Sequence, residues 1–223
     1  MELKYTLIAD GSSDRTLLKI IKWSLDNLYP TLANEGSFAD FRSLKNPPKT
    51  LKQKVDAAKT FYPSDIVFIH RDGETTNSKI VEKRRLEVLN ELGEFEFRRV
   101  ICVVPIKMME SWLLIDNEAI KKAAGNRSFS GEMNLPLLKN IEKENQPKLL
   151  LHTLLTTASG LKGRGLKKFN PDRAVHFVAE YIDDFSLLRR LVAFQAFEEI
   201  LKMVINEFLE SAENRIIVQN RAE

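Results

Sequence analysis

The chain has 223 residues, of which 43% are hydrophobic and 29% charged, as is ordinary for a globular protein with a substantial core. Its single cysteine, Cys102, lies in an apolar run, which excludes a disulfide framework and a cysteine-based zinc cluster. The formal net charge of +3 permits a nucleic-acid partner but does not by itself predict one.

The first half of the chain alternates strand and helix patterns. Ser12 and Ser13 can cap the first of the expected helices. We predict strands over 3–9, 38–44, 65–70 and 99–105, and helices over 14–28, 49–61 and 78–92. This alternation, with near-continuous apolar strands, favours a parallel sheet with helices on its faces. We therefore expect an α/β core over residues 1–116.

The rest of the chain, residues 117–223, is expected to be a mainly helical region packed on that core. Helical patterns cover 117–125, 147–158, 171–182 and 186–210. The residues after 210 fit either a frayed helix or a loose tail. No long apolar run could span a bilayer, and the start MELKYTLIAD lacks the features of a signal peptide, so we expect a cytoplasmic protein with no membrane partner.

Acidic residues follow three of the predicted strands. They are Asp10 and Asp14, then Asp72 and Glu74, and finally Glu110 and Asp116. Ligands of an open parallel sheet bind beyond the carboxyl ends of its strands, where these residues would meet. Grouped carboxylates bind hard divalent ions such as Mg²⁺, which polarise phosphoryl oxygens and activate water. The pattern therefore predicts a metal site that acts on phosphate.

Each of these residues also has a purely structural interpretation. Asp10 and Asp14 could begin a helix, where carboxylates complement the helix dipole. Asp72 could belong to an ordinary turn with Gly73, and Glu110 could cap a helix. Asp116 fits a helix boundary better than a functional role.

Five segments resemble a known family. In this order, 9-ADGSSD-14, 67-VFIHRDGE-74 and 105-PIKMMESWLLID-116 resemble a Toprim domain. Together with 146-QPK-148 and 184-DFSLLRRLVAF-194, they resemble more narrowly the bacterial family called domain of unknown function 4276. The resemblance implies a Toprim-like, Rossmann-like sheet. It also implies Mg²⁺-dependent action on phosphodiester bonds, as in primases, topoisomerases and OLD-family nucleases.

The resemblance assigns roles to particular residues. Asp10 takes the place of the glutamate after the first strand, Asp72 that of the second aspartate of an Asp-x-Asp pair, and Glu110 that of the acid in a Glu-x-Trp-Leu segment. His70 stands where the first aspartate is expected, and histidine suits Mn²⁺ better than Mg²⁺. In another register Asp72 and Glu74 form the acidic pair. His70 would then stay on the strand as a metal ligand or as a locally hydrogen-bonded side chain.

Basic residues could hold the phosphates of a nucleic acid. The glycine-rich segment 160–169 is expected to be a flexible loop that carries Lys162, Arg164, Lys167 and Lys168. A solvated loop without a ligand would have the same sequence. Lys148 would approach the acidic edge if the resemblance holds. Arg189 and Arg190 lie in an apolar helical pattern and are expected to pair with carboxylates, including those of the site.

The leading hypothesis is a metal-dependent phosphodiester hydrolase that acts on DNA or RNA with Mg²⁺ or Mn²⁺, in prokaryotic defence or DNA processing. The alternatives are a catalytically degenerate module that binds nucleic acid, a nucleotide or a protein, and a subunit that works with a partner such as an ATPase or as a homodimer. The sequence contains no Walker loop, nucleophile elbow or dinucleotide-binding glycine motif. Kinases, serine hydrolases and dehydrogenases are therefore disfavoured.

Overall fold

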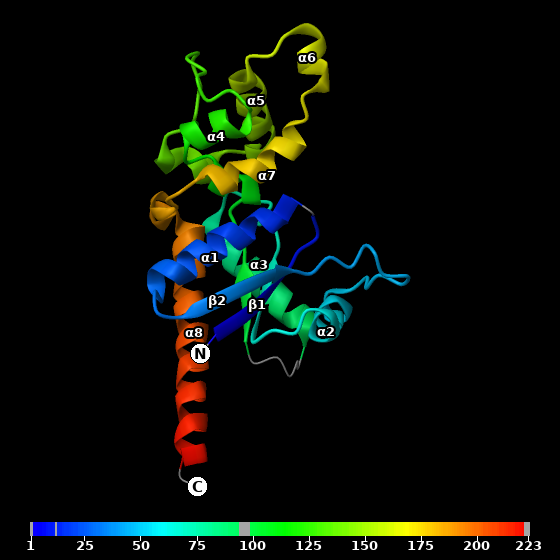
Figure 1. Cartoon of the computed structure of the whole chain (residues 1–223), viewed down its shortest axis with the longest axis vertical. Helices are drawn as coiled ribbons and strands as arrows, with labels where there is room; N and C mark the ends of the chain where they lie inside the picture. The colour runs from blue at the N-terminus through cyan, green and yellow to red at the C-terminus, as the bar shows by residue number, and fades with distance from the viewer. Residues whose placement is uncertain (1, 12, 94–98, 221–223) are drawn as a thin grey trace.

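The computed structural model describes residues 2–11, 13–93 and 99–220. Within these ranges the strands form one parallel sheet in the order β2-β1-β3-β4, with helices between successive strands (Figure 1). The strands are β1 (Glu2–Ile8), β2 (Ala33–Phe38), β3 (Ile66–His70) and β4 (Val100–Val103). The prediction of a parallel α/β core is therefore confirmed.

Strand β3 is buried along its whole length because it pairs with β1 on one side and with β4 on the other. Ile8 pairs with Ile69, and His70 pairs with Val103, so the three strands end at nearly the same level. Residues that follow these strands therefore leave the sheet at one edge. Cys102 is buried in β4, as expected for a reduced core cysteine.

Three helices of the first half connect the strands. They are α1 (Leu17–Leu28), which follows a short 3₁₀ helix at Ser13–Thr16, α2 (Leu51–Phe61) and α3 (Ser78–Leu92). Helix α2 begins with a capping box, in which Thr50 and Gln53 satisfy each other's backbone N–H groups. These helices confirm the predicted ones, whereas the suggested cap Ser12 lies outside the described residues.

The second half is helical, as predicted. Its elements are the 3₁₀ helices η2 (Met109–Leu113), η3 (Leu138–Lys143) and η4 (Ser186–Arg190) and the helices α4 (Asn117–Ala123), α5 (Pro147–Ser159), α6 (Gly163–Lys168), α7 (Pro171–Tyr181) and α8 (Val192–Asn220). Helices α4, α5 and α7 pack together above the sheet in Figure 1, and α7 also contacts α1. Helix α8 runs down past the sheet, where Phe197 lies against Phe68 of β3. None of the described helices combines the length and apolarity needed to cross a lipid bilayer.

The predicted strand over 38–44 is wrong. The strand is the preceding segment Ala33–Phe38, and Phe41, which is buried, follows it in a stretch without regular structure. That edge strand is polar and contains Gly36, whose position would place a Cβ 2.4 Å from the ring of Tyr5. Pairing with β1 and this close ring contact, rather than strand propensity, explain where β2 forms.

Two other elements differ from the sequence expectation. The segment 160–169 contains helix α6 instead of a continuous flexible loop, and local backbone hydrogen bonds close its turns. The expected helix over 186–210 is divided at Leu191, which is extended. Glu142 accepts hydrogen bonds from the backbone N–H groups of Val192 and Ala193 and so caps the start of α8. Helix α8 continues to Asn220, and residues 221–223 lie outside the described chain.

Candidate functional site

The carboxyl ends of β1, β3 and β4 surround a cavity of about 400 Å³, hereafter the site cavity. Residues from α3 and α5 complete its wall. The lining residues are Asp10, Gly11, Ser13, Asp14, His70, Arg71, Asp72, Glu74, Arg84, Met108, Glu110 and Lys148. The structure thus brings together the acidic residues proposed from the sequence, with the exception of Asp116. Asp116 instead caps α4 by accepting the N–H groups of Glu118 and Ala119.

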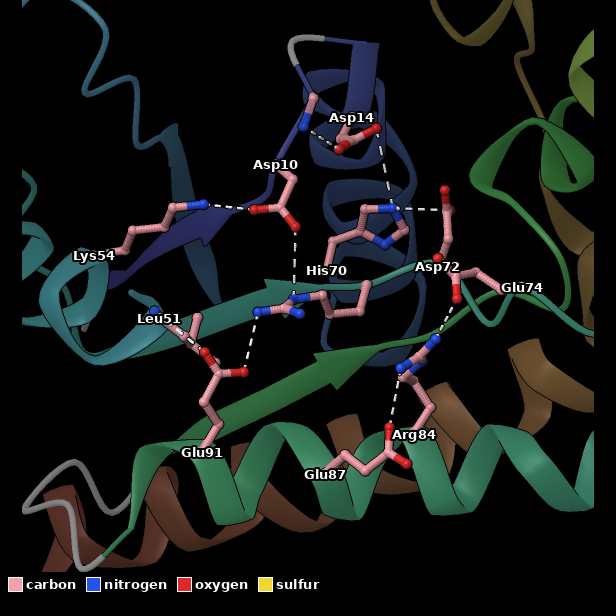
Figure 2. A network of polar contacts seen from close by, with 12 residues as sticks. Asp10, Asp14, Leu51, Lys54, His70, Asp72, Glu74, Arg84, Glu87 and Glu91 are labelled. Atoms are coloured by element: carbon pink, nitrogen blue, oxygen red, sulfur yellow. Dashed lines mark hydrogen bonds and ion pairs between the residues drawn. The ribbon is translucent and has the colours of Figure 1, made fainter. Parts of the chain in front are cut away.

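His70 lies at the centre of this arrangement with only 3% of its surface exposed. Its Nδ1 is 3.0 Å from the carbonyl oxygen of Val103, and because a carbonyl can only accept, Nδ1 carries a proton. Its Nε2 faces Asp72 Oδ1 at 3.3 Å and Asp14 Oδ1 at 4.0 Å (Figure 2). Burial lowers the pKa of His70, but the hydrogen bond to Asp72 and the charge of Asp14 outweigh it, so the pKa is raised. The raised pKa favours the protonated ring, whose charge would offset part of the negative charge of the two aspartates.

Asp72 is held in place by the backbone around it. Its Oδ1 accepts the N–H of Met109 at 3.1 Å, and the N–H of Gly73 donates to the carbonyl of Pro105 at 3.0 Å. A Cβ at Gly73 would lie 2.6 Å from that carbonyl oxygen, so only glycine fits this approach. The segments after β3 and β4 are thus joined by their backbones, which is more than the ordinary turn that the sequence allowed.

Two further carboxylates contribute negative charge to the cavity. Glu110, in η2, is 4% exposed, and burial raises the pKa of its carboxyl, as does the charge of Asp72 and Asp14. Lys148 Nζ lies 4.0 Å from Glu110 Oε1 and opposes that increase. Asp14 accepts the N–H of Gly11 at 2.9 Å, and burial raises its pKa despite the attraction of His70. Asp14, Asp72 and Glu110 therefore share one electrostatic environment.

Asp10 occupies the rim of the site cavity and faces cations instead of His70 (Figure 2). Its carboxylate contacts the Nζ of Lys54 and lies 3.6 Å from Arg71 Nε. Burial raises the pKa of Asp10, but the hydrogen bond and charge of Lys54, together with Arg71, lower it overall. Arg71 also contacts Glu91 at 3.2 Å.

Glu74 is likewise held at the rim. It pairs with Arg84, which also contacts Glu87 at 3.0 Å. Of the metal ligands proposed from the sequence, His70 and Asp72 thus contact each other at the centre of the cavity. Glu110 lines the same cavity, and burial together with the charge of Asp72 raises the pKa of its carboxyl. Asp10 and Glu74 are instead held in ion pairs with basic residues.

Several functional candidates escaped the sequence interpretation. Asp14 was grouped with the acidic residues at the strand ends but was not named as a metal ligand, although its place one turn after β1 in 9-ADGSSD-14 was a usable signal. Arg71 adjoins His70 in sequence, but nothing local marks Lys54 or Arg84. Both come from helices: Arg84 lines the cavity, and Lys54 contacts Asp10 at its rim, in each case only through the tertiary fold.

The basic residues proposed for phosphate binding are separated by the structure. Lys148 lines the site cavity, whereas Lys162, which precedes α6, and the α6 residues Arg164, Lys167 and Lys168 are exposed and do not line it. Helix α6 lies at the upper tip of the molecule in Figure 1, beyond α7.

The two arginines before α8 also lie outside the site cavity. Arg189 Nε is 3.0 Å from both carboxylate oxygens of Glu198, and its guanidinium lies 4.8 Å from the ring centroid of Trp23. Arg189 therefore pairs with a carboxylate, as expected, but in a contact between α8 and α1. Arg190 is exposed.

The donor chemistry of the cavity fits a divalent ion. Metal-bound histidines usually donate their second ring N–H to a carbonyl or carboxylate, as His70 does to Val103. The oxygens of Asp14 and Asp72 flank the free ring nitrogen, and a mixed nitrogen and oxygen set suits Mn²⁺. Among the described residues, however, no three Asp, Glu, His or Cys side chains form a ready-made metal group. Binding would therefore require the carboxylates to close around Nε2 and this nitrogen to be free of a proton.

Comparison of the chain with protein-family models, curated proteins and solved structures found no match.

Proposed function

We propose that this protein is a divalent-metal-dependent phosphodiester hydrolase that acts on nucleic acid. The observation that carries the proposal is the gathering of Asp14, His70, Asp72 and Glu110 around one cavity at the carboxyl ends of parallel strands. The resemblance of these segments to a Toprim domain, stated above, supports the same chemistry.

Each of these side chains has a distinct role in the proposal. Asp14 and Asp72 hold the ion through oxygen and His70 through Nε2, while the Nδ1–H bond to Val103 fixes the ring. A bound Mn²⁺ or Mg²⁺ supplies polarisation of a phosphoryl oxygen and activation of water. Glu110 is suited to take up the proton of the attacking water, because burial raises the pKa of its carboxyl toward neutrality.

Lys148 completes the proposed machinery. Its Nζ lies beside Glu110 and 3.9 Å from Asp172 Oδ1, and its side chain is 42% exposed to the cavity and solvent. A phosphate that enters the cavity can therefore reach it without displacing a buried ion pair. We expect Lys148 to stabilise the negative charge that develops on the phosphoryl group.

The test is a cleavage assay with labelled single- and double-stranded DNA and RNA in Mn²⁺, Mg²⁺ or chelator. We expect cleavage that requires the metal and falls by about a hundredfold or more in Asp72→Asn and Glu110→Gln. Asp116→Asn is the matched control, because asparagine also caps helices and Asp116 is outside the cavity. Cleavage that persists in chelator, or an equal loss in all three variants, would contradict the proposal.

One observation favours a second candidate, a module that binds nucleic acid or a nucleotide without cleaving it. In the described chain, Nε2 of His70 already faces Asp72 and Asp14, and a proton on this nitrogen would offset their charge without a metal ion. Binding that weakens with salt, with every substrate left intact and no metal bound, would support this candidate.

A further inference from the structure

Two more hollows continue from the site cavity along the segment 39–50. The second, of about 140 Å³, shares Asp10 and Gly11 with the site cavity. The third, of about 680 Å³, shares Pro47 and Pro48 with the second. Neighbouring hollows thus share wall residues, and the second and third are together called the 39–50 groove, which lies between Asp10 and helix α2.

The 39–50 groove is bordered by cations. Lys54 stands where the site cavity and the second hollow meet, and its Nζ contacts Asp10. Lys45 and Lys49 border the third hollow and are exposed. Within the described part of the chain, neither of these two lysines pairs with a carboxylate, so their charges are available to a ligand. Phosphates at the spacing of a nucleic-acid backbone could contact such a series.

Aromatic rings line the same hollows. Phe38 and Phe41 stand in the wall of the second hollow, and Phe61 stands in the wall of the third. Phe61 is 56% exposed, although a phenylalanine ring is normally buried. Tyr62 anchors the wall, because its hydroxyl bonds both the N–H and the carbonyl of Asp40. Of the three rings only Phe61 is exposed, and an exposed ring near cations is the combination with which single-strand-binding proteins hold bases and phosphates.

The basic helix α6 does not adjoin the site cavity as the 39–50 groove does. Its three cations and the preceding Lys162 do not line the site cavity or either hollow of the 39–50 groove. In Figure 1 the segment 39–50 projects to the right between β2 and α2, while α6 lies at the top of the molecule. Of the two basic regions, only the groove adjoins the carboxylates.

We propose that the 39–50 groove binds single-stranded nucleic acid, with phosphates at Lys45, Lys49 and Lys54 and an unpaired base stacked on Phe61. A paired base lies inside a duplex stack and cannot offer its face to a ring, which makes the groove selective for single strands. This inference rests on the proposed function, because the groove would hold the part of the strand that lies on one side of the phosphodiester in the site cavity.

The lysines are tested by fluorescence anisotropy with labelled single-stranded DNA and RNA in chelator, which prevents cleavage. We expect the double variant Lys45→Gln, Lys49→Gln to raise Kd by about tenfold and to reduce the slope of log affinity against log salt by about 1.4. The matched double variant Lys167→Gln, Lys168→Gln carries the same change of charge on α6 and should shift Kd less than about twofold. An equal or larger effect on α6 would overturn the proposal.

The aromatic contact is tested in the same titration. We expect Phe61→Ala to raise Kd for a single strand by about tenfold and to leave the weaker binding of a duplex hairpin unchanged. Phe177→Ala removes a ring of similar exposure from α7 and should have no effect. Unchanged affinity in Phe61→Ala, a tighter hairpin, or no binding of either single strand would each overturn the proposal. Both rings are exposed, and circular dichroism verifies that the variants are folded.

A small substrate separates this inference from the proposed function. Bis(para-nitrophenyl) phosphate has no strand to occupy the 39–50 groove, so its hydrolysis with Mn²⁺ depends on the site cavity alone. We expect the Lys45, Lys49 and Phe61 variants to hydrolyse it at the native rate. If single strands bind as described but this substrate stays intact, the proposed hydrolase fails while the groove stands. If the substrate is hydrolysed and the variants bind strands normally, the groove fails while the hydrolase stands.

Discussion

Replacing Gly73 by alanine tests whether the joined ends of β3 and β4 position Asp72. The new Cβ would lie 2.6 Å from the carbonyl oxygen of Pro105, which also accepts the Gly73 N–H at 3.0 Å. Because the opposing atom belongs to the backbone, no side-chain rotation can relieve the contact, and the two segments must separate. Overpacking of this kind lowers the free energy of unfolding by about 1–3 kcal/mol. The same separation would pull Asp72 away from the N–H of Met109 and from His70.

The assay is urea denaturation followed by circular dichroism in chelator, with a parallel Mn²⁺ titration. Gly73→Ala should lose about 2 kcal/mol of stability and bind Mn²⁺ more weakly. Gly165→Ala in α6 is the control, because its Cβ would meet Leu161 at an ordinary 3.4 Å and helices favour alanine by up to about 1 kcal/mol. Native stability together with native Mn²⁺ affinity in Gly73→Ala would refute the reasoning, because the junction would then not constrain Asp72.

Three further predictions concern the core and can be measured with the same methods. Phe68→Ala should lower the free energy of unfolding in urea by about 3–5 kcal/mol, since this ring of β3 is fully buried, and a loss under about 1 kcal/mol would be inconsistent with that packing. Glu198→Gln should lower the free energy of unfolding by about 1–2 kcal/mol. This is less than the loss expected on breaking a fully buried ion pair, because the side chain of its partner Arg189 is 37% exposed. An unchanged free energy of unfolding would show that the pair contributes nothing. Burial raises the pKa of Cys102 to about 11, so a thiol reagent at mildly alkaline pH should modify it only after unfolding, and rapid labelling of folded protein would count against a buried thiol.

The elements that were predicted best are those in which the hydrophobic pattern and the residues at the boundaries indicate the same structure. Helix α3 occupies Ser78–Leu92 as expected, and Asn77 caps its first turn through the N–H of Lys79. Strand β3 was recognisable because a strand covered on both sides is continuously apolar. Strand β2 was misplaced because an edge strand forms through its partner β1, and its polar sequence carries little local preference.

The sequence was enough to predict at which edge of the sheet the candidate site lies, but not which way its side chains point. Parallel topology was enough to bring Asp72 and Glu110 together. It could not decide between Asp10 and Asp14, because that choice depends on Lys54, which reaches Asp10 from α2. Once Asp10 is engaged there, Asp14 is the carboxylate after β1 that faces His70. A contact between residues so far apart in the sequence has no local signal.

The proposed metal site around His70 is tested most directly by a Mn²⁺ titration followed by electron paramagnetic resonance, in which the signal of free Mn²⁺ disappears on binding. The native protein and Asp10→Asn should both bind Mn²⁺, whereas Asp14→Asn should bind at least about tenfold more weakly. This order is expected because Asp14 faces Nε2 of His70, while Asp10 is paired with Lys54 and Arg71. Loss of binding in Asp10→Asn with retention in Asp14→Asn, or no binding by the native protein, would contradict the metal site described here.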